Sequence, residues 1–160
     1  MLAALITPRE QPLRIVLVLP ARAERGKWAN DQYVSRLRAA DGGRGIVSVY
    51  VLYTSGPTAG AHPFTDRPIY VHSKIAIMDD AWLMVGSANM NDWGFVTDSE
   101  LNVLIHDAGL ARDLRLDLWA EHLALPRAEV AQQEPVHLVD HVWGERARDT
   151  VQRVTSGDRP

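Results

Sequence analysis

The sequence predicts an α/β fold in which a mainly parallel, mixed sheet is flanked by helices. Residues 13–20 and 46–53 are two continuous apolar runs, which is typical of strands buried on both faces. Residues 28–40, between these runs, carry apolar side chains at helical spacing. Strand, helix and strand in this order indicate a crossover unit of a parallel sheet. A chain of 160 residues that is 46% hydrophobic is long enough to bury one core.

The elements of the first half follow from local patterns. "LRIVLVLP" is bounded by prolines and predicts the first strand, at residues 13–20. "DGGRG", at residues 41–45, is expected to end the helix that follows. "IVSVYVLY" predicts the second strand, at residues 46–53. Residues 54–68 are rich in Gly, Pro, Ser and Thr, so they predict a long loop, and loops of that length often border functional sites.

The second half predicts a group of strands followed by helices. "HSKIAIMD" and "WLMVGS" are expected to form adjacent strands joined at Asp79 and Asp80, and "SELNVLIHD" predicts a third strand. "AGLARDLRLDLWAEHLAL" predicts a helix, and a last helix is expected after a polar segment that contains Pro126 and Pro135. We therefore expect one domain over residues 1–125 and a helical extension with a tail over residues 126–160.

Composition and charge limit the classes of function. The formal net charge is −3, so the sequence lacks the basic field that drives nonspecific binding of nucleic acid. It contains no cysteine, which excludes disulfides, thiolate nucleophiles and cysteine-bound zinc. It also shows neither a signal peptide nor an apolar stretch that could cross a bilayer. The expectation is a soluble, cytoplasmic protein, with transient contact at a membrane surface as a further hypothesis.

His72 and Lys74 form a pair that favours an anion. In a strand over residues 72–78, period-two alternation would place both side chains on one face. An imidazole and an ammonium side by side repel when both are charged, so their position makes most sense opposite an anion such as phosphate. Lys27 and Lys74 are the only lysines among 17 basic residues, which indicates a specific use for the compact ammonium of Lys74.

Further polar residues follow the next two predicted strands. "GSAN", at residues 86–89, offers the Ser87 hydroxyl, the Asn89 amide and backbone donors, a suitable set for phosphate oxygens. Glu100 stands thirteen residues after Ser87, at the start of another predicted strand. Its carboxylate could accept a hydrogen bond from the histidine and so determine which tautomer is present.

The spacing of these residues resembles a known family. "HSKIAIMD" matches H-x-K-x4-D, and the six residues that follow it lead into G-S-x-N at residues 86–89. This pattern resembles the phospholipase D superfamily, and the flanking "IYVHSK" and "NMNDWGFVTDSELNV" are similar to its phospholipase and transphosphatidylase branch. The resemblance extends over most of residues 13–123. It implies a phospholipase D-like half as the fold, here the C-terminal half of a protein with two such motifs.

The resemblance also implies a mechanism and a role for each matching residue. It implies a two-step phosphodiester exchange through a phosphohistidine, with no metal and no cofactor. The positions that match the motif would share this work as follows: His72 as nucleophile or general acid, Lys74 and Asn89 on the nonbridging oxygens, Ser87 as their support, Glu100 orienting His72, and Asp79 outside the chemistry itself. Trp93, which follows "GSANMND", is expected to line the entrance to the site and to contact substrate.

One departure from the family pattern leaves two arrangements open. Active sites of this family use two H-x-K motifs, and this sequence has one. Either a homodimer builds the site across its twofold axis, or the chain is one half of a longer protein, which is the arrangement we favour. In the second case His72 would be the general acid, and in the first case two copies of His72 would share both roles.

The function predicted from these patterns is metal-independent phosphodiester hydrolysis or transfer on phospholipid head groups. Three alternatives stay open: a homodimeric nuclease, a cardiolipin-synthase-like phosphatidyltransferase, and a catalytically incomplete half-domain. A fourth possibility is metal binding by His137 and His141, which are four residues apart on a predicted helix. The sequence offers no third ligand for such a site, so two histidines on a helix surface are the favoured interpretation.

Overall fold

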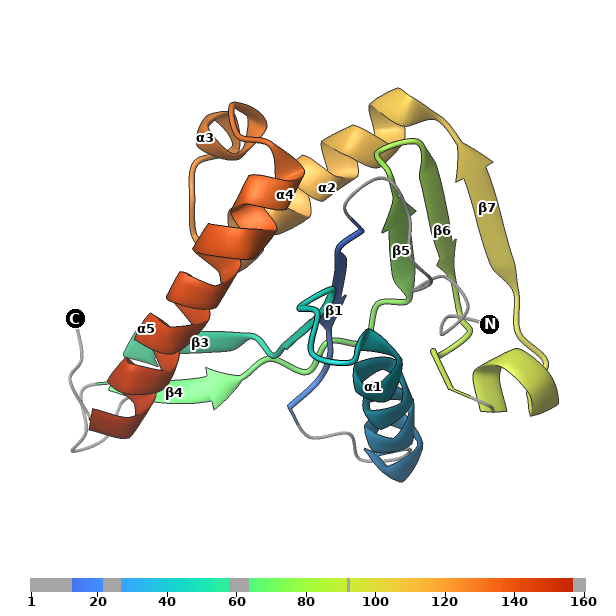
Figure 1. Ribbon diagram of the computed structural model, residues 1–160, viewed down its shortest axis with the longest axis horizontal. Coiled ribbons are helices and arrows are strands. Elements are labelled where there is room, and N and C mark those ends of the chain that lie inside the picture. The colour runs from blue at the N-terminus through green and yellow to red at the C-terminus, as the bar shows by residue number, and fades with distance from the viewer. Residues whose placement is uncertain (1–12, 22–26, 58–63, 92, 157–160) are drawn as a thin grey trace. The chain divides into compact units, whose positions relative to one another are not determined.

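The computed structural model describes residues 13–21, 27–57, 64–91 and 93–156 (Figure 1). Contacts within the chain divide it into two compact units. The described residues of unit 1 fall within 13–21, 34–57, 64–71 and 135–156. The described residues of unit 2 fall within 27–33, 72–91 and 93–134. Helices and strands occur together in the chain, so the predicted α/β class is confirmed.

The crossover unit predicted for the first half is present. In unit 1, β1 (Ile15–Val18) pairs in parallel with β2 (Val47–Tyr50), with Ile15 opposite Val47. Helix α1 (Lys27–Asp41) connects the two strands along the chain, as a parallel pair requires. The ladder continues past the end of β1, because Leu19 N–H donates to the Tyr50 carbonyl at 2.9 Å.

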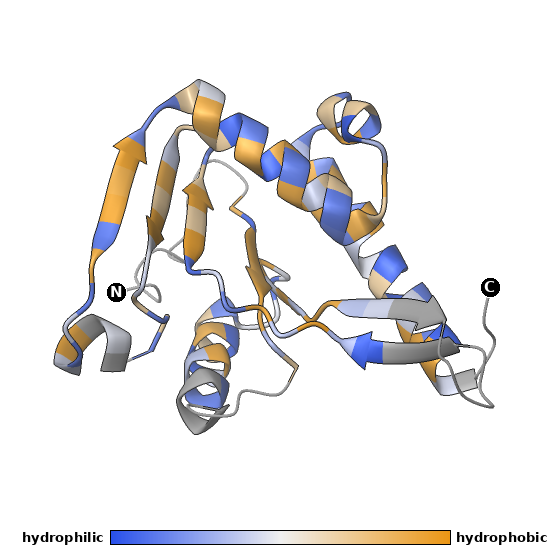
Figure 2. Ribbon diagram, turned by 180° about the vertical axis from the view of Figure 1, so that it is seen from behind, coloured by the Kyte–Doolittle hydropathy of each residue, from blue (hydrophilic) through white to orange (hydrophobic). Residues whose placement is uncertain are grey.

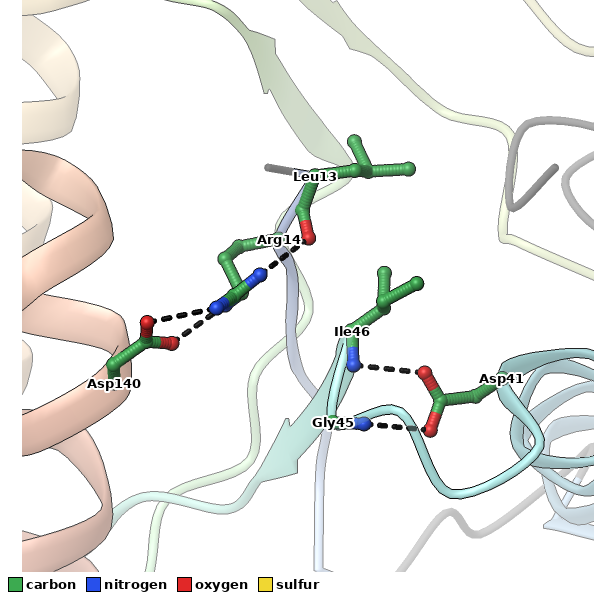
Figure 3. A network of polar contacts seen from close by, with 6 residues as sticks. All are labelled: Leu13, Arg14, Asp41, Gly45, Ile46 and Asp140. Carbon is green, nitrogen blue, oxygen red and sulfur yellow. Dashed lines mark hydrogen bonds and ion pairs between the residues drawn. The ribbon is translucent and has the colours of Figure 1, made fainter. Parts of the chain in front are cut away.

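The turn after α1 is held by the carboxylate of Asp41, which is 7% exposed. It accepts hydrogen bonds from the backbone N–H groups of Gly45 at 3.1 Å and Ile46 at 2.7 Å (Figure 3). Burial raises the pKa of Asp41, but the backbone donors outweigh burial and hold this pKa below its ordinary value. Gly42 and Gly43 have φ of 61° and 80°, which favours glycine. The predicted helix end is confirmed.

The long loop predicted for residues 54–68 was wrong in part. β3 (Tyr53–Pro57) and β4 (Phe64–Pro68) form an antiparallel pair in which Tyr53 lies opposite Pro68. The predicted second strand accordingly ends at Tyr50, and β3 begins at Tyr53. Glycine and proline hid these strands from pattern analysis. Proline is tolerated here because each strand of a two-stranded ribbon is an edge strand, where a missing N–H need not break a ladder.

The predicted last helix is confirmed as a run of helical segments in unit 1. It comprises α4 (Pro135–His137), a π-helical segment η3 (Leu138–Trp143) and α5 (Gly144–Ser156). The buried Trp143 ring lies 4.9 Å from the Tyr50 ring, measured between centroids. These contacts do not test whether residues 126–160 fold apart from the rest, so the boundary at residue 125 stays a prediction.

An ion pair joins this helical run to the segment before β1. Arg14 donates to both carboxylate oxygens of Asp140, at 2.5 and 2.8 Å (Figure 3). The hydrogen bond from Arg14 holds the pKa of Asp140 below its ordinary value of 3.8. Because the folded-state pKa is the lower one, the pair stabilises the fold above pH 3.8, and this contribution is lost as the pH falls through the folded-state pKa.

Unit 2 contains a three-stranded antiparallel sheet. β5 (Ile75–Met78), β6 (Trp82–Gly86) and β7 (Asn102–His106) lie in that order, and the residues of β5 and β7 are mostly hydrophobic (Figures 1 and 2). Asp107 begins the next helix, α2 (Ala108–Leu123), because its side chain accepts from Leu110 N–H. A set of buried hydrophobic side chains contributes to the core of this unit: Leu83, Ala111, Leu116, Leu123 and Val130.

The expected orientation of the strands is corrected. Among the described strands, the pairing of β1 with β2 is parallel and the other pairings are antiparallel, so the prediction of a mainly parallel sheet was wrong for these residues. The three residues between β5 and β6 are too few for a parallel crossover. The polar segment after Pro126 includes a short helix, α3 (Arg127–Ala131), and Arg127 donates to Asp113 and Asp117 of α2 at 2.6 Å each.

Candidate active site

Several of the predicted site residues, among them Lys74, Ser87 and Glu100, gather at one end of the three-stranded sheet. Because neighbouring strands are antiparallel, the start of β5, the end of β6 and the start of β7 lie at the same end (Figure 1). Gly86 N–H donates to the Lys74 carbonyl at 3.1 Å, and Gly86 lies opposite Asn102. The structure thus places the segment of His72 and Lys74 beside the segments of residues 86–89 and 100–102.

His72 and Lys74 come just before β5 and not within it. The strand was predicted over residues 72–78, but it begins at Ile75. The carbonyl of Lys74 still joins the ladder, which fixes the backbone there. The Lys74 ammonium donates to the His72 carbonyl at 2.6 Å, and the His72 side chain is exposed. The ammonium therefore lies beside the His72 backbone with two further N–H donors available for a ligand.

Ser87 links the end of β6 to the segment before β7. Its hydroxyl donates to the Glu100 carboxylate and accepts from Leu101 N–H at 3.1 Å. Its own N–H donates to the Leu101 carbonyl at 3.0 Å. Because the hydroxyl proton is directed at Glu100, Ser87 holds the turn in this arrangement, and its predicted role in support of the phosphate oxygens stays a prediction. A contact of Glu100 with His72, the predicted orienting role, stays a prediction.

Gly86 is required by a close backbone approach. A Cβ at this position would lie 2.0 Å from Asn102 Oδ1 and 2.4 Å from the Leu101 carbonyl oxygen. Asn102 Oδ1 also accepts from Ala88 N–H at 3.4 Å. Asn102 thus holds the "GSAN" turn from the neighbouring strand, a role that sequence analysis missed. The feature that reveals this role is the position of Asn102 opposite Gly86, and that position is known only once the strand register is known.

The segment after Asn89 contains a second residue that sequence analysis missed. Asn91 is 6% exposed although it lies in a loop. Its N–H donates to the Asn89 carbonyl at 2.8 Å, and its side-chain oxygen accepts from Gly94 N–H at 2.9 Å. A π-helical turn, η2 (Trp93–Thr97), follows. The side chain of Trp93, predicted to contact substrate, lies outside the described part of the structure.

Asp79 is not brought to the other predicted residues. It lies in the turn between β5 and β6, is exposed and has φ of 54°. It comes five positions after Lys74, at the far end of the extended strand β5, a distance of about 16 Å at 3.3 Å per residue. The neighbouring Asp80 makes the structural contact instead. Its carboxylate accepts from Arg115 of α2 at 2.6 and 2.8 Å, and Arg115 is 7% exposed.

Asp80→Asn is expected to lower the free energy of unfolding by about 3 kcal/mol, because it leaves the buried Arg115 charge without its carboxylate. Asp79→Asn is the matched control, and its effect should stay within about 0.5 kcal/mol. Both positions have positive φ, which asparagine tolerates. Urea unfolding of the two variants measures the difference. Equal effects, or a larger effect at Asp79, would show that the contact with Arg115 does not hold the hairpin.

His137 and His141 lie on the helical run of unit 1, with ring centroids 4.7 Å apart. Within the described residues there is no group of three potential ligands that could hold a metal ion. In the same part of the chain, each helix is too short or too polar to cross a membrane.

Comparison with known proteins identifies several similar sequences. A family model described as "Cardiolipin synthase, PLD-like domain" matches residues 1–120. Phospholipase D zeta 1 of Arabidopsis thaliana is 38% identical over 103 residues, which is 54% of this chain and 9% of that protein. Phospholipase D2 of Bos taurus is 45% identical over 83 residues, which is 49% of this chain and 9% of that protein. Cardiolipin synthase B of Escherichia coli K12 is 36% identical over 72 residues, which is 45% of this chain and 17% of that protein. Each match covers a small part of the relative's length.

Proposed function

The chain belongs to the phospholipase D-like domain family, and from that premise we propose that it supplies one half of the active site of a metal-independent phosphodiesterase. The substrate would be a phospholipid, because the relatives with high similarity are phospholipases D by name. The observation that carries the proposal is the meeting of three strand ends, which brings His72, Lys74, Ser87 and Glu100 to one end of the sheet.

The proposed reaction exchanges the head group of the phosphodiester in two steps. In the first, a histidine nitrogen forms a bond to phosphorus, the bond from phosphorus to the head-group oxygen breaks, and a second histidine gives its proton to that oxygen. In the second, water gives a proton back to the second histidine and attacks phosphorus, and the phosphorus–nitrogen bond breaks. His72 would be the second histidine if another chain segment supplies the first. In a homodimer, two copies of His72 would take both roles.

Lys74 and Asn89 would stabilise the charge that builds up on the nonbridging oxygens. Lys74 can direct two N–H donors to these oxygens while its third donor stays on the His72 carbonyl. The side-chain amide of Asn89 offers two more donors, and Asn89 is exposed at the end of the turn. Donors held in place before the reaction stabilise a transition state without further reorganisation, which is how a site of this kind can work without a metal.

A phosphatidyltransferase is the second candidate. The matching family model and one group of relatives carry the name cardiolipin synthase. The same site residues would serve, with an alcohol in place of water in the second step. The acceptor alcohol distinguishes the two candidates, because hydrolysis releases a phosphatidic acid and transfer releases a new phosphodiester.

The proposal is tested by three measurements on one preparation. Light scattering at several concentrations gives the oligomeric state. Vesicles of phosphatidylcholine, with and without glycerol, show hydrolysis or transfer, and DNA serves as the competing substrate. A titration with inorganic phosphate, followed by NMR of labelled protein, reports binding at His72 and Lys74. A dimer is expected to turn over lipid, and a monomer to bind phosphate without turnover. A chain that neither binds phosphate nor turns over lipid, or that cleaves only DNA, would contradict the proposal.

A further inference from the structure

Asn91 is a buried amide in a loop, between the exposed Asn89 and the buried Gly94. The buried polar residues described in the structure are Asp41, Asn91 and Arg115. Asp41 holds the turn after α1, and Arg115 pairs with Asp80. Burying an amide is costly unless it forms hydrogen bonds, so the burial of Asn91 requires a reason of its own. Its neighbour Asn89, two residues earlier, has an exposed side chain.

Asn91 is linked to Asn89 in two ways, directly by its backbone and through Gly94 by its side chain. Its backbone N–H donates to the Asn89 carbonyl at 2.8 Å. Its side-chain oxygen accepts from Gly94 N–H at 2.9 Å. Gly94 in turn packs directly on the Asn89 backbone, because a Cβ on Gly94 would lie 2.4 Å from the Asn89 carbonyl oxygen and 2.6 Å from its nitrogen. Asn89, Asn91 and Gly94 therefore form a closed set of contacts.

This set of contacts fixes the backbone of Asn89 and leaves its side chain exposed. An amide that binds two phosphate oxygens must hold both N–H groups in one orientation, and a flexible backbone would scatter them. Holding such a group by neighbours that do not touch the ligand avoids ordering it at the moment of binding. The buried amide and the close glycine contact are two independent observations that meet on the same residue.

We propose that Asn91 and Gly94 are positioning residues, which fix the conformation of Asn89 so that its side-chain amide binds phosphate oxygens. The inference rests on the proposed function, because it takes Asn89 to be a phosphate ligand. Neither residue belongs to the H-x-K-x4-D or G-S-x-N positions, and neither is required to touch the substrate. Their contribution would reach the phosphate only through the backbone of Asn89.

Two pairs of variants test this on the full chain. Gly94→Ala forces the added methyl group into the Asn89 backbone, whereas Gly144→Ala is the matched control, because its methyl group would meet only the end of the Arg148 side chain at 3.4 Å. Asn91→Ala removes the acceptor for Gly94 N–H, whereas Asn91→Asp keeps one. Thermal unfolding shows that each variant folds. The other readouts are the hydrogen exchange of the Gly94 amide, the NMR signals of the Asn89 side-chain amide, and the affinity for inorganic phosphate.

Gly94→Ala and Asn91→Ala are expected to shift the Asn89 side-chain signals and to weaken phosphate binding by about tenfold, the value of one hydrogen bond to a charged group. Asn91→Ala should also speed the exchange of the Gly94 amide by about tenfold, while Asn91→Asp restores its protection. Gly144→Ala should match the wild-type chain. A merely structural role would lower the unfolding temperature without shifting the Asn89 signals.

Unchanged Asn89 signals and unchanged phosphate affinity in both Gly94→Ala and Asn91→Ala would overturn the inference. If the wild-type chain neither binds phosphate nor turns over lipid, the proposed function fails, and the Asn89 signals still decide whether Asn91 positions that residue. If Gly94→Ala does not fold, the comparison of Asn91→Ala with Asn91→Asp decides. If Asn91→Ala loses the protection of the Gly94 amide and the Asn89 signals shift, positioning is supported. If the protection is lost and the Asn89 signals do not shift, positioning is contradicted.

Discussion

Replacement of His72 by alanine is expected to abolish turnover of a phosphodiester. The rate should fall by at least about 10²-fold, because acid–base groups contribute about 10²- to 10⁴-fold and a lost nucleophile costs no less. The fold should persist, since the His72 side chain is exposed and precedes β5. The measurement is the rate on phosphatidylcholine vesicles by the assembled enzyme, as a dimer or with its second half, together with thermal unfolding of the variant.

His137→Ala is the control for His72→Ala. It removes an exposed histidine from the helical run of unit 1, which carries none of the proposed site residues. It should keep the wild-type rate. If His72→Ala retained more than about one per cent of the turnover, the fall in rate would be smaller than the contribution of an acid–base group. His72 would then be neither nucleophile nor general acid. If His72→Ala unfolded the chain, a structural role would replace the catalytic one.

Lys74→Arg is expected to lower kcat by about 10²-fold, although it keeps the positive charge. The loss would equal that of one donor to a developing oxyanion. The Lys74 ammonium donates to the His72 carbonyl at 2.6 Å, and its two other N–H groups are on the same nitrogen. The planar fork of arginine is longer and spreads its donors over three nitrogens, so it cannot keep this bond and reach the same oxygens.

The control is Lys27→Arg, the same substitution at the only other lysine of the sequence. The rates of both variants should be measured over a range of lipid concentrations, so that kcat and KM are obtained separately. A loss in kcat for Lys74→Arg alone would place the ammonium on the reacting phosphate. Wild-type kcat with a raised KM would assign Lys74 to ground-state binding, and a wild-type rate throughout would remove the specific need for a lysine.

Local patterns were sufficient for several elements. The apolar runs and the helical spacing between them predicted β1, α1 and β2 in their correct order, and "DGGRG" marked the end of α1. These signals lie within contiguous residues, where periodicity and glycine content act directly on the backbone. The pair of β3 and β4 was missed because its glycines and prolines read as a loop. Only pairing with another segment makes such residues a strand.

The site residues also divide into those that local patterns predicted and those that only tertiary contacts revealed. The spacing of His72, Lys74, Ser87 and Asn89 was enough to indicate the family and a phosphodiester reaction. The spacing also pointed to Asp79, but the structural contact belongs to Asp80, whose partner Arg115 is 35 residues further along the chain. No local pattern distinguishes two adjacent aspartates in one turn. The distinction arises from which carboxylate faces α2.

The sequence by itself determined the family, the residue types of the candidate site and their order along the chain, because a motif is a matter of spacing between contiguous residues. Only the tertiary structure decided which residues hold that motif in place. Asn102 supports the turn from a neighbouring strand, and Ser87 is bound by Glu100 thirteen residues away. Burial and cross-strand pairing depend on groups distant in sequence, and their hydrogen bonds exist only once those groups have been brought together.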